Sequence, residues 1–306
     1  MKLGVAAGAT AAMIVGASVP ITGMLDGYPV LTGQAMRYAL GAAVLLLVAR
    51  RLPMPSRRDI PPLLGVVVTG MLGFNAVLIA AQQYAEPGFV AAVMGGSPIA
   101  LALLSRQRTA SAVVGAVVVA AGIVLLSGGG SWHGPGLVLA LITMVGEVCF
   151  TLFAVGVVRR LGVLGVATWT CIFATVIGAV LGTFFGGWQM PNAQQGFSLV
   201  LLAVVVTALA FGLWYFAVNR LGSDRAGVLI GLMPVSGLAT SVLLGAQELT
   251  LVSVAGVTTV ALGCVIGLRR GTHEPEGTHH THDSGRVPPK STIAKGSDTP
   301  AEVVAP

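Results

Sequence analysis

Two stretches of the chain decide its fold, FVAAVMGGSPIALALLS at residues 89–105 and VLIGLMPVSGLATSVLL at residues 228–244. Both are continuously apolar, and both carry a proline near the middle, Pro98 in the first and Pro234 in the second. Their length and composition predict two membrane-embedded helices of related sequence. The chain therefore contains an internal repeat.

The similarity continues on both sides of these stretches. The segment GAVVVAAGIVLL at residues 115–126 recurs as GVTTVALGCVIGL at residues 256–268, and Thr69 recurs as Thr207. The spacing between matching residues drifts slightly, as small loop insertions produce. We infer that one unit is present twice along most of the chain.

Composition excludes a soluble globular domain. Hydrophobic residues make up 55% of the 306 residues, and charged residues only 9%. The apolar runs are near the roughly 20 residues that a helix needs to cross about 30 Å of hydrocarbon. Many of the 42 glycines fall inside these runs, which suits closely packed membrane helices. We expect an all-α integral membrane protein.

Ten transmembrane helices are predicted from the apolar runs and the turn-forming residues between them. Their expected ranges are 3–25, 30–49, 62–83, 87–105, 110–127, 135–157, 163–185, 196–219, 226–244 and 251–268.

Basic residues predict the orientation of these helices. With Lys2 in the cytoplasm, every Lys and Arg except Arg37 falls in an inner loop or in the C-terminal tail. Such a bias sets membrane orientation. It also accounts for the net charge of +6 without nucleic acid as a partner. We expect both termini of this multi-pass protein in the cytoplasm.

Five helices per copy is an odd number, so the second copy starts on the opposite side of the membrane. We predict a 5+5 inverted-topology repeat, with the first copy at residues 1–130 and the second at 131–270. Residues 271–306 are rich in Pro, Gly, Thr and Ser, which predicts a disordered cytoplasmic tail. Inverted repeats are the usual build of secondary transporters, whose substrate site lies between the halves near mid-membrane.

No cofactor and no metal site are expected. Cys149, Cys171 and Cys264 all lie within apolar spans and lack metal-ligand spacing. The tail motif His279-His280-Thr281-His282, with His273, could hold a metal weakly, although histidines in a flexible tail are more often solvated. A GxxxxGK[ST] loop is absent from the sequence, so ATP is not the expected internal energy source.

Three segments resemble the EamA-like members of the drug/metabolite transporter superfamily. They are RYALGAAVLLL (37–47), AAQQYAEPGFVAAVMGGSPIALALL (80–104) and NRLGSDRAGVLIGLMPVSGLATSVLLGAQELT (219–250). The resemblance implies a bacterial cytoplasmic-membrane carrier with a central cavity. It also implies transport of small metabolites, amino acid-like solutes or drugs, by exchange or proton coupling. The sequence departs from the family pattern near Arg106, where the acidic end of the first LGE-like motif is missing.

Glu147 is the leading candidate for a functional residue, because it is the only acidic side chain deep within a predicted span. A lone carboxylate in hydrocarbon is costly, so it should face a wet cavity, pair with a partner or hold a proton. It could bind a proton and a substrate amine or cation in turn. The alternative is a structural carboxylate hydrogen-bonded to Ser or Thr. The repeat places Val15 at the matching position of the first copy.

Two further polar residues are candidate substrate ligands. Arg37 lies about two turns into its helix, where it could hold a substrate carboxylate through a bidentate contact or simply extend to the membrane interface. Asn75 lies mid-helix, where it could line the cavity or bond a neighbouring helix.

Hinges are predicted around the two prolines. Pro98 and Pro234 each remove a helical N–H, and Gly95, Gly96 and Gly231 beside them lower the cost of bending. We expect these points to flex during alternating access, whereas the alternative is a static kink.

Tryptophans and glycine stripes have simpler interpretations. Trp132, Trp188 and Trp169 are expected in the interfacial aromatic belts. Trp214 and Tyr215 are expected there too, with contact to a substrate as the alternative. The stripes at Gly178, Gly182, Gly186 and at Gly263, Gly267 suit close helix packing within the chain, with a homodimer as the alternative.

Two other functional classes remain open. A channel or a non-transporting scaffold would share this composition. An intramembrane enzyme on a lipid-linked substrate would need clustered catalytic groups at one depth. The spans contain one deep Glu and no His, so we do not expect an enzyme.

Overall fold

The computed structural model describes residues 1–18, 21, 25, 27–49, 52–85, 87–105, 109–128, 131–243 and 248–269. These residues belong to one compact unit, Met1–Gly271. The predicted cytoplasmic tail, with its histidines, lies outside the described residues.

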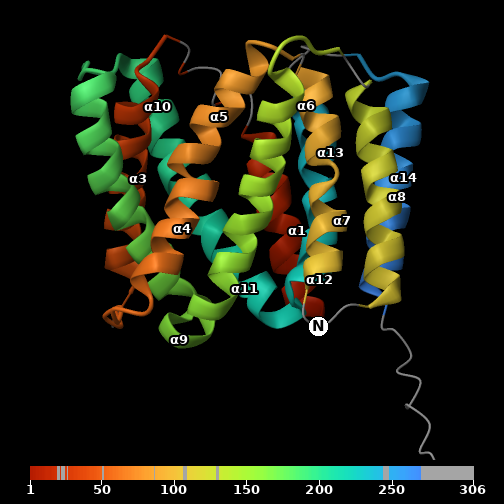
Figure 1. Cartoon of the computed structure of the whole chain (residues 1–306), viewed down its shortest axis with the longest axis horizontal. Coiled ribbons are helices and arrows are strands. Elements are labelled where there is room, and N and C mark those ends of the chain that lie inside the picture. The colour runs from red at the N-terminus through yellow and green to blue at the C-terminus, as the bar shows by residue number, and fades with distance from the viewer. Residues whose placement is uncertain are drawn as a thin grey trace, which may run out of the picture. The chain divides into compact units, whose positions relative to one another are not determined.

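The first half of the described chain is a series of helices (Figure 1). They are α1 (Lys2–Ala17), α3 (Val30–Val48), α4 (Ile60–Gly70), α5 (Leu72–Gln82), α6 (Pro87–Met94), α7 (Ser97–Leu104) and α8 (Ala110–Ser127).

The second half is also helical, with two segments of non-α geometry. It comprises α9 (Gly136–Phe185), α10 (Ala193–Leu201), the π-helix η1 (Leu202–Ala210), α11 (Phe211–Leu221), α12 (Ser223–Val228), the 3-10 helix η2 (Leu229–Gly231), α13 (Leu232–Leu243) and α14 (Leu251–Leu268). The described residues form no strand beyond one isolated bridge between Ala85 and Trp132.

Six helices of the described chain are long and apolar enough to cross a membrane. They cover Val30–Val48, Ile60–Gln82, Ala110–Ser127, Gly136–Phe185, Ala193–Leu221 and Leu251–Leu268. The prediction of an all-helical, multi-pass membrane protein is therefore confirmed. The ten-span count is not established, because several predicted spans are shorter or interrupted.

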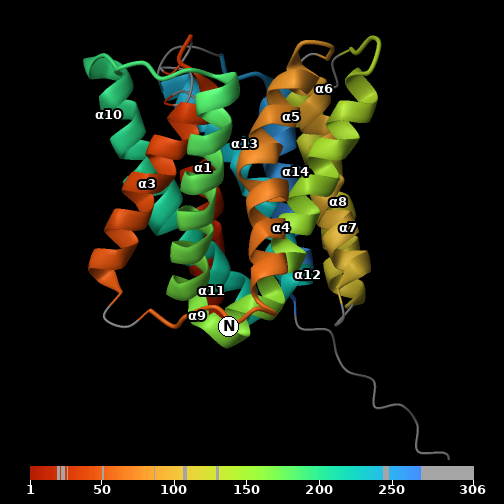
Figure 2. The same cartoon turned by 60° about the vertical axis from the view of Figure 1, so that its left-hand side comes forward.

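The 50-residue helix α9 has two arms that meet at an elbow. Gly162 has a φ of 72°, in the left-handed region that glycine adopts without strain. The predicted helices 135–157 and 163–185 correspond to the two arms. Figure 2 shows the elbow at the same end of the bundle as the N-terminus of the chain.

Interruptions occur at matching places in the two copies. The helix predicted at 62–83 breaks at Met71, between α4 and α5, whereas the one predicted at 196–219 contains the π-helix η1. The helix predicted at 87–105 breaks at the turn Gly95–Gly96, and its partner passes through η2. Sequence periodicity did not reveal these departures, because apolar residues cover all faces of these helices.

Small residues set the closest helix contacts. A side chain added to Gly263 of α14 would come within 2.7 Å of the Val119 nitrogen in α8. One added to Gly182 of α9 would meet Thr32 of α3 at 2.6 Å. Both stripes therefore contact helices of the same chain, as the intrachain prediction required. Figure 1 shows α8 and α14 side by side.

Candidate functional site

A cavity of about 600 Å³ lies between helices of both halves. The lining comes from α1, α4, α5, α6, α8, α9, η1, α11, η2 and α13, together with Gly95. Most lining side chains are apolar. Cavities of this size and character are typical of small-molecule sites.

Three polar groups of this cavity stand out because they have no partner. Glu147 Oε2, Thr151 Oγ1 and Trp214 Nε1 line the cavity, are shielded from solvent, and make no hydrogen bond among the described residues. Glu147 and Thr151 are four residues apart on α9, which places them on one helical face. Buried polar atoms are nearly always paired. Three unpaired ones in one cavity suggest that a bound solute or water completes the site.

Ser97, the first residue of α7, lies beside the Glu147 carboxyl. The two side chains interact electrostatically, but neither Ser97 Oγ nor Glu147 Oε2 achieves hydrogen-bond geometry. Ser97 is the hydroxyl that the structural alternative for Glu147, a carboxylate hydrogen-bonded to Ser or Thr, would use. The carboxyl retains capacity for another ligand.

Aromatic rings form one wall of the cavity. The Phe150 ring lies 5.8 Å from Phe211 and 5.9 Å from Tyr215, measured between centroids. Phe74 and Trp214 line the cavity as well. Such rings offer both apolar surface and a negative π-face to a bound cation.

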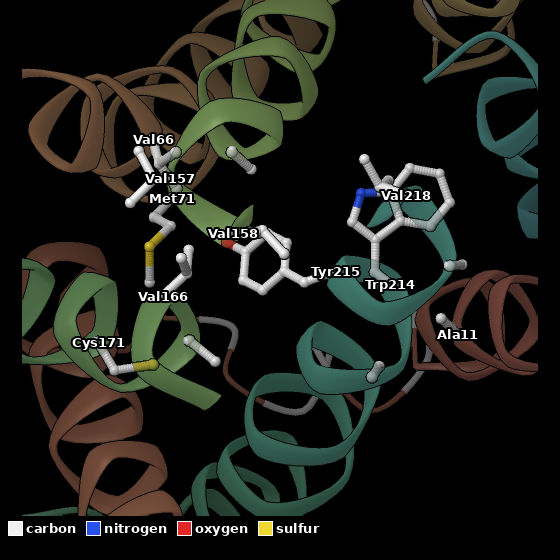
Figure 3. Packing of buried hydrophobic residues seen from close by; sticks show 14 of the residues in the cluster. Ala11, Val66, Met71, Val157, Val158, Val166, Cys171, Trp214, Tyr215 and Val218 are labelled. Atoms are coloured by element: carbon white, nitrogen blue, oxygen red, sulfur yellow. The ribbon is translucent and has the colours of Figure 1, made fainter. Parts of the chain in front are cut away.

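The interfacial prediction for Trp214 and Tyr215 is wrong. Trp214 is 6% exposed, and Tyr215 is fully buried. Figure 3 shows Trp214 and Tyr215 leaving α11 in different directions, with Tyr215 extending toward Val158 of α9. Trp214 and Tyr215 are near the end of the predicted span 196–219, which suggested that they lie at the membrane interface. The structure instead places α11 inside the bundle. Trp132 and Trp188 are exposed, in agreement with the belt interpretation.

The cavity lies toward one end of the helices. Val15 and Gly16 line it near the C-terminal end of α1, and Leu126 and Ser127 do so at the end of α8. Toward the opposite end, side chains fill the space between the halves. A side chain added to Gly8 of α1 would meet Leu229 at 2.6 Å, and one added to Gly227 of α12 would meet Leu101 at 2.9 Å.

Arg37 is buried on the inner face of α3 and is not among the lining residues. Its Nε donates a 2.8 Å hydrogen bond to Thr207 Oγ1 in η1. The interfacial alternative for Arg37 would require an exposed guanidinium, whereas this side chain is 9% exposed.

Asn75 is also not among the lining residues, although its neighbour Phe74 is. Its amide Nδ2 donates to the Met71 carbonyl, which is at the break between α4 and α5. This contact is local, within one helical turn of the same segment.

Each predicted hinge proline lies in the first turn of a helix rather than in mid-helix. Pro98 follows Ser97 at the start of α7, and Pro234 is the third residue of α13. A proline there costs no helical hydrogen bond, because the first N–H groups have no intrahelical partner. Pro234, Gly95 and Gly237 line the cavity. The chain is thus already interrupted where bending was predicted.

An ion pair joins the start of α4 to α9 at the end of the bundle with the N-terminus. Arg160 Nε lies 2.6 Å from Asp59 Oδ1, and Ser56 Oγ donates a 2.6 Å bond to Asp59 Oδ2. The Ser56 hydroxyl and then the Arg160 guanidinium lower the pKa of the Asp59 carboxyl. Asp59 therefore fixes the start of α4 to the α9 elbow.

Residues 134–269 match the model of the EamA-like transporter family. This half of the chain is therefore similar to EamA-like transporters. It contains Glu147, Thr151, Trp214 and Pro234, and thus the polar side of the cavity. The family resemblance predicted from the sequence is confirmed there.

Curated proteins similar to most of this chain have names that refer to transport. The uncharacterized transporter YetK of Bacillus subtilis (strain 168) is 24% identical over 279 residues, which cover 85% of this chain and 83% of the relative. An uncharacterized transporter of Archaeoglobus fulgidus is 25% identical over 252 residues, which cover 77% of this chain and 87% of the relative.

A solved structure titled only as the crystal structure of a protein shares the fold of this chain. It superposes with a TM-score of 0.76 at 20% identity, covering 88% of this chain and 97% of that one. The similarity supports the arrangement of the helices in both halves.

Proposed function

We propose that the protein is a secondary transporter that moves a small solute across the cytoplasmic membrane by alternating access. The observation that carries this proposal is the cavity between the halves, where Glu147, Thr151 and Trp214 present unpaired polar atoms on an otherwise apolar surface. The names of the family and of the relatives support transport rather than enzymatic chemistry.

The chemistry of the cavity favours a cationic amine with an apolar body. Glu147 supplies the charge that would bind an ammonium group or, alternately, a proton. Phe74, Phe150, Phe211 and Trp214 supply aromatic surface for the apolar part. Competition between proton and solute for one carboxyl would couple uptake of one to release of the other.

The proposed transporter is a 5+5 inverted repeat, with halves at residues 1–130 and 131–270 and both termini in the cytoplasm. In support, the two copies depart from α geometry at matching places. Described basic segments, at the N-terminus, before α4, at the α9 elbow and around the start of α12, lie at one end of the bundle (Figure 1). That end would face the cytoplasm.

With this orientation, the conformation would be open toward the outside, because the cavity lies toward the end opposite the N-terminus. The hinges would be Gly95–Gly96 with Pro98 and Gly231 with Pro234. The cavity forms within one chain, so the proposed mechanism does not require a homodimer.

Replacement of Glu147 by Gln tests the proposal in proteoliposomes with an imposed pH gradient. Gln keeps the size of the side chain but cannot bind a proton or neutralise a cation. We expect gradient-driven uptake of cationic amines to fall to the level of empty liposomes, while the folded yield is unchanged. A thermal-shift screen with amines and amino acids would first identify a ligand.

The matched control is Glu248→Gln, which removes an acidic group from an exposed position. It should transport at the wild-type rate. Gradient-driven transport that survives in Glu147→Gln would remove Glu147 from the mechanism. Current far above carrier turnover would instead favour a channel.

A further inference from the structure

Arg37 is a buried charge that the cavity does not use. It lies on the inner face of α3, which also buries Gln34, Tyr38 and Gly41. Thr207, which accepts its Nε hydrogen bond, is fully buried in the middle of η1. A side chain added to Gly41 would meet Thr207 Cγ2 at 2.9 Å. Glycine at this position lets α3 approach η1 closely enough for the hydrogen bond.

The positive charge of Arg37 has no anionic partner in the described part of the chain. The one ion pair among the described residues joins Asp59 to Arg160 and does not involve Arg37. The nearest compensation is the Tyr38 ring, whose centroid lies 5.5 Å from the Arg37 guanidinium carbon. A guanidinium stays protonated at any pH of interest. A buried charge without a counter-charge is costly, and most of all in a membrane-spanning helix.

Donor groups remain available around this charge. The hydrogen bond of Nε to Thr207 Oγ1 is the one that the described residues offer the Arg37 guanidinium, which leaves its Nη groups as donors for a ligand. Gln34, one turn away on the same face, makes no hydrogen bond within the described chain, and its Oε1 is enclosed. Amide oxygen and nitrogen are interchangeable by rotation, so Gln34 can also present N–H donors.

We propose that Arg37 and Gln34 bind a monovalent anion between α3 and η1, with Thr207 holding the guanidinium in position. The ligand chemistry is that of a halide or a carboxylate, because planar N–H donors match both. Two sources share this chemistry, an inorganic anion and the carboxylate of a solute. The site is separate from Glu147 and does not depend on the proposed transport.

The test is anion-dependent thermal stability of the purified protein in detergent. Chloride, formate or acetate replaces gluconate, a much bulkier anion, at constant ionic strength. A ligand that binds only the folded state raises the melting temperature saturably. We expect such a rise for the wild-type protein and its loss in Arg37→Gln.

Two further variants sharpen the result. Arg159→Gln removes the same charge from an exposed position and should keep the wild-type response. Thr207→Val removes the positioning hydrogen bond but leaves the guanidinium, so the dissociation constant should rise roughly threefold to tenfold.

The anions that raise the melting temperature would identify the source of the ligand. A response to chloride alone would assign an inorganic anion, whereas competing responses to formate and acetate would assign a solute carboxylate. A wild-type protein that responds to none of these anions overturns the proposal, as does an unchanged response in Arg37→Gln. If Arg37→Gln does not fold, unchanged anion affinity in Thr207→Val overturns it. None of these outcomes bears on Glu147.

Discussion

Glu147 is unusual at the residue scale because its repeat counterpart is Val15. Both residues line the cavity, so the two copies contribute a carboxylate and a methyl-bearing side chain to the same space. In the proposed repeat, the charge therefore belongs to the second copy only.

The Asp59→Asn variant should lose stability in a pH-dependent way. Partners that lower the pKa of Asp59 in the folded state contribute stability above the unfolded aspartate value of about 3.9. This contribution disappears as the pH falls through the lower folded value. We expect the melting temperature of Asp59→Asn to lie below that of the wild type at pH 7, and the difference to shrink below about pH 4.

Arg160→Gln is the partner control for this prediction. It removes one of the two main contacts of Asp59 and leaves the one with Ser56. Its melting temperature at pH 7 should therefore fall by less than that of Asp59→Asn. Equal melting temperatures of Asp59→Asn and wild type at neutral pH would show that the loop contact adds nothing to stability.

Single functional residues could be predicted from the sequence where a charged side chain lies within an apolar span. Glu147 was found because a carboxylate inside an apolar span is conspicuous. Thr151 was missed, because hydroxyls are common in membrane helices, and contact of Trp214 with a substrate was only the alternative to the belt. Thr151 lies one helical turn after Glu147, and that spacing was the available signal.

At the scale of elements, uninterrupted helices were predicted well and broken ones were not. The ranges 110–127 and 251–268 agree with α8 and α14, which are bounded by Thr caps and polar loops. The breaks at Met71 and in η1 depend on tertiary packing, as around the Arg37–Thr207 contact. Local sequence carries no mark of that contact.

Pro234→Ala should slow transport without weakening solute binding. Alanine supplies the missing N–H and has a higher helix propensity. The change would let α13 extend into η2 and stiffen the predicted hinge. We expect a several-fold lower turnover with an unchanged dissociation constant, measured by flux in proteoliposomes and by thermal shift.

Pro98→Ala provides the matched change in the first copy, since it also lies in the first turn of a helix. A rate loss in only one of the two variants would mean that the two halves do not bend alike. Wild-type turnover in both variants would leave the prolines as static kinks.

The whole molecule offers a direct check of the proposed orientation. Gln194 at the start of α10 and Arg159 before the α9 elbow are both exposed. In a background without native cysteines, a membrane-impermeant thiol reagent should label Gln194→Cys in intact cells. Arg159→Cys should react only after permeabilisation. Labelling of both in intact cells would contradict the inverted repeat.

At the scale of the whole molecule, the structural class was easier to predict than the way the helices pack around the cavity. Composition and repeat led to an all-helical membrane protein, which the structure confirms. The cavity and its occlusion toward one end depend on how glycines such as Gly8 and Gly227 let opposing helices meet. Those contacts join residues far apart in sequence, so periodicity alone does not specify them.

In the proposed exchange mechanism, the lone carboxyl of Glu147 would limit the stoichiometry. One such group in the described cavity lining would trade one proton for one monovalent cation in each cycle. That exchange moves no net charge, so the electrical potential of the membrane would neither drive nor oppose it, and only the pH difference would supply work. A divalent solute would make the same cycle electrogenic and therefore sensitive to voltage.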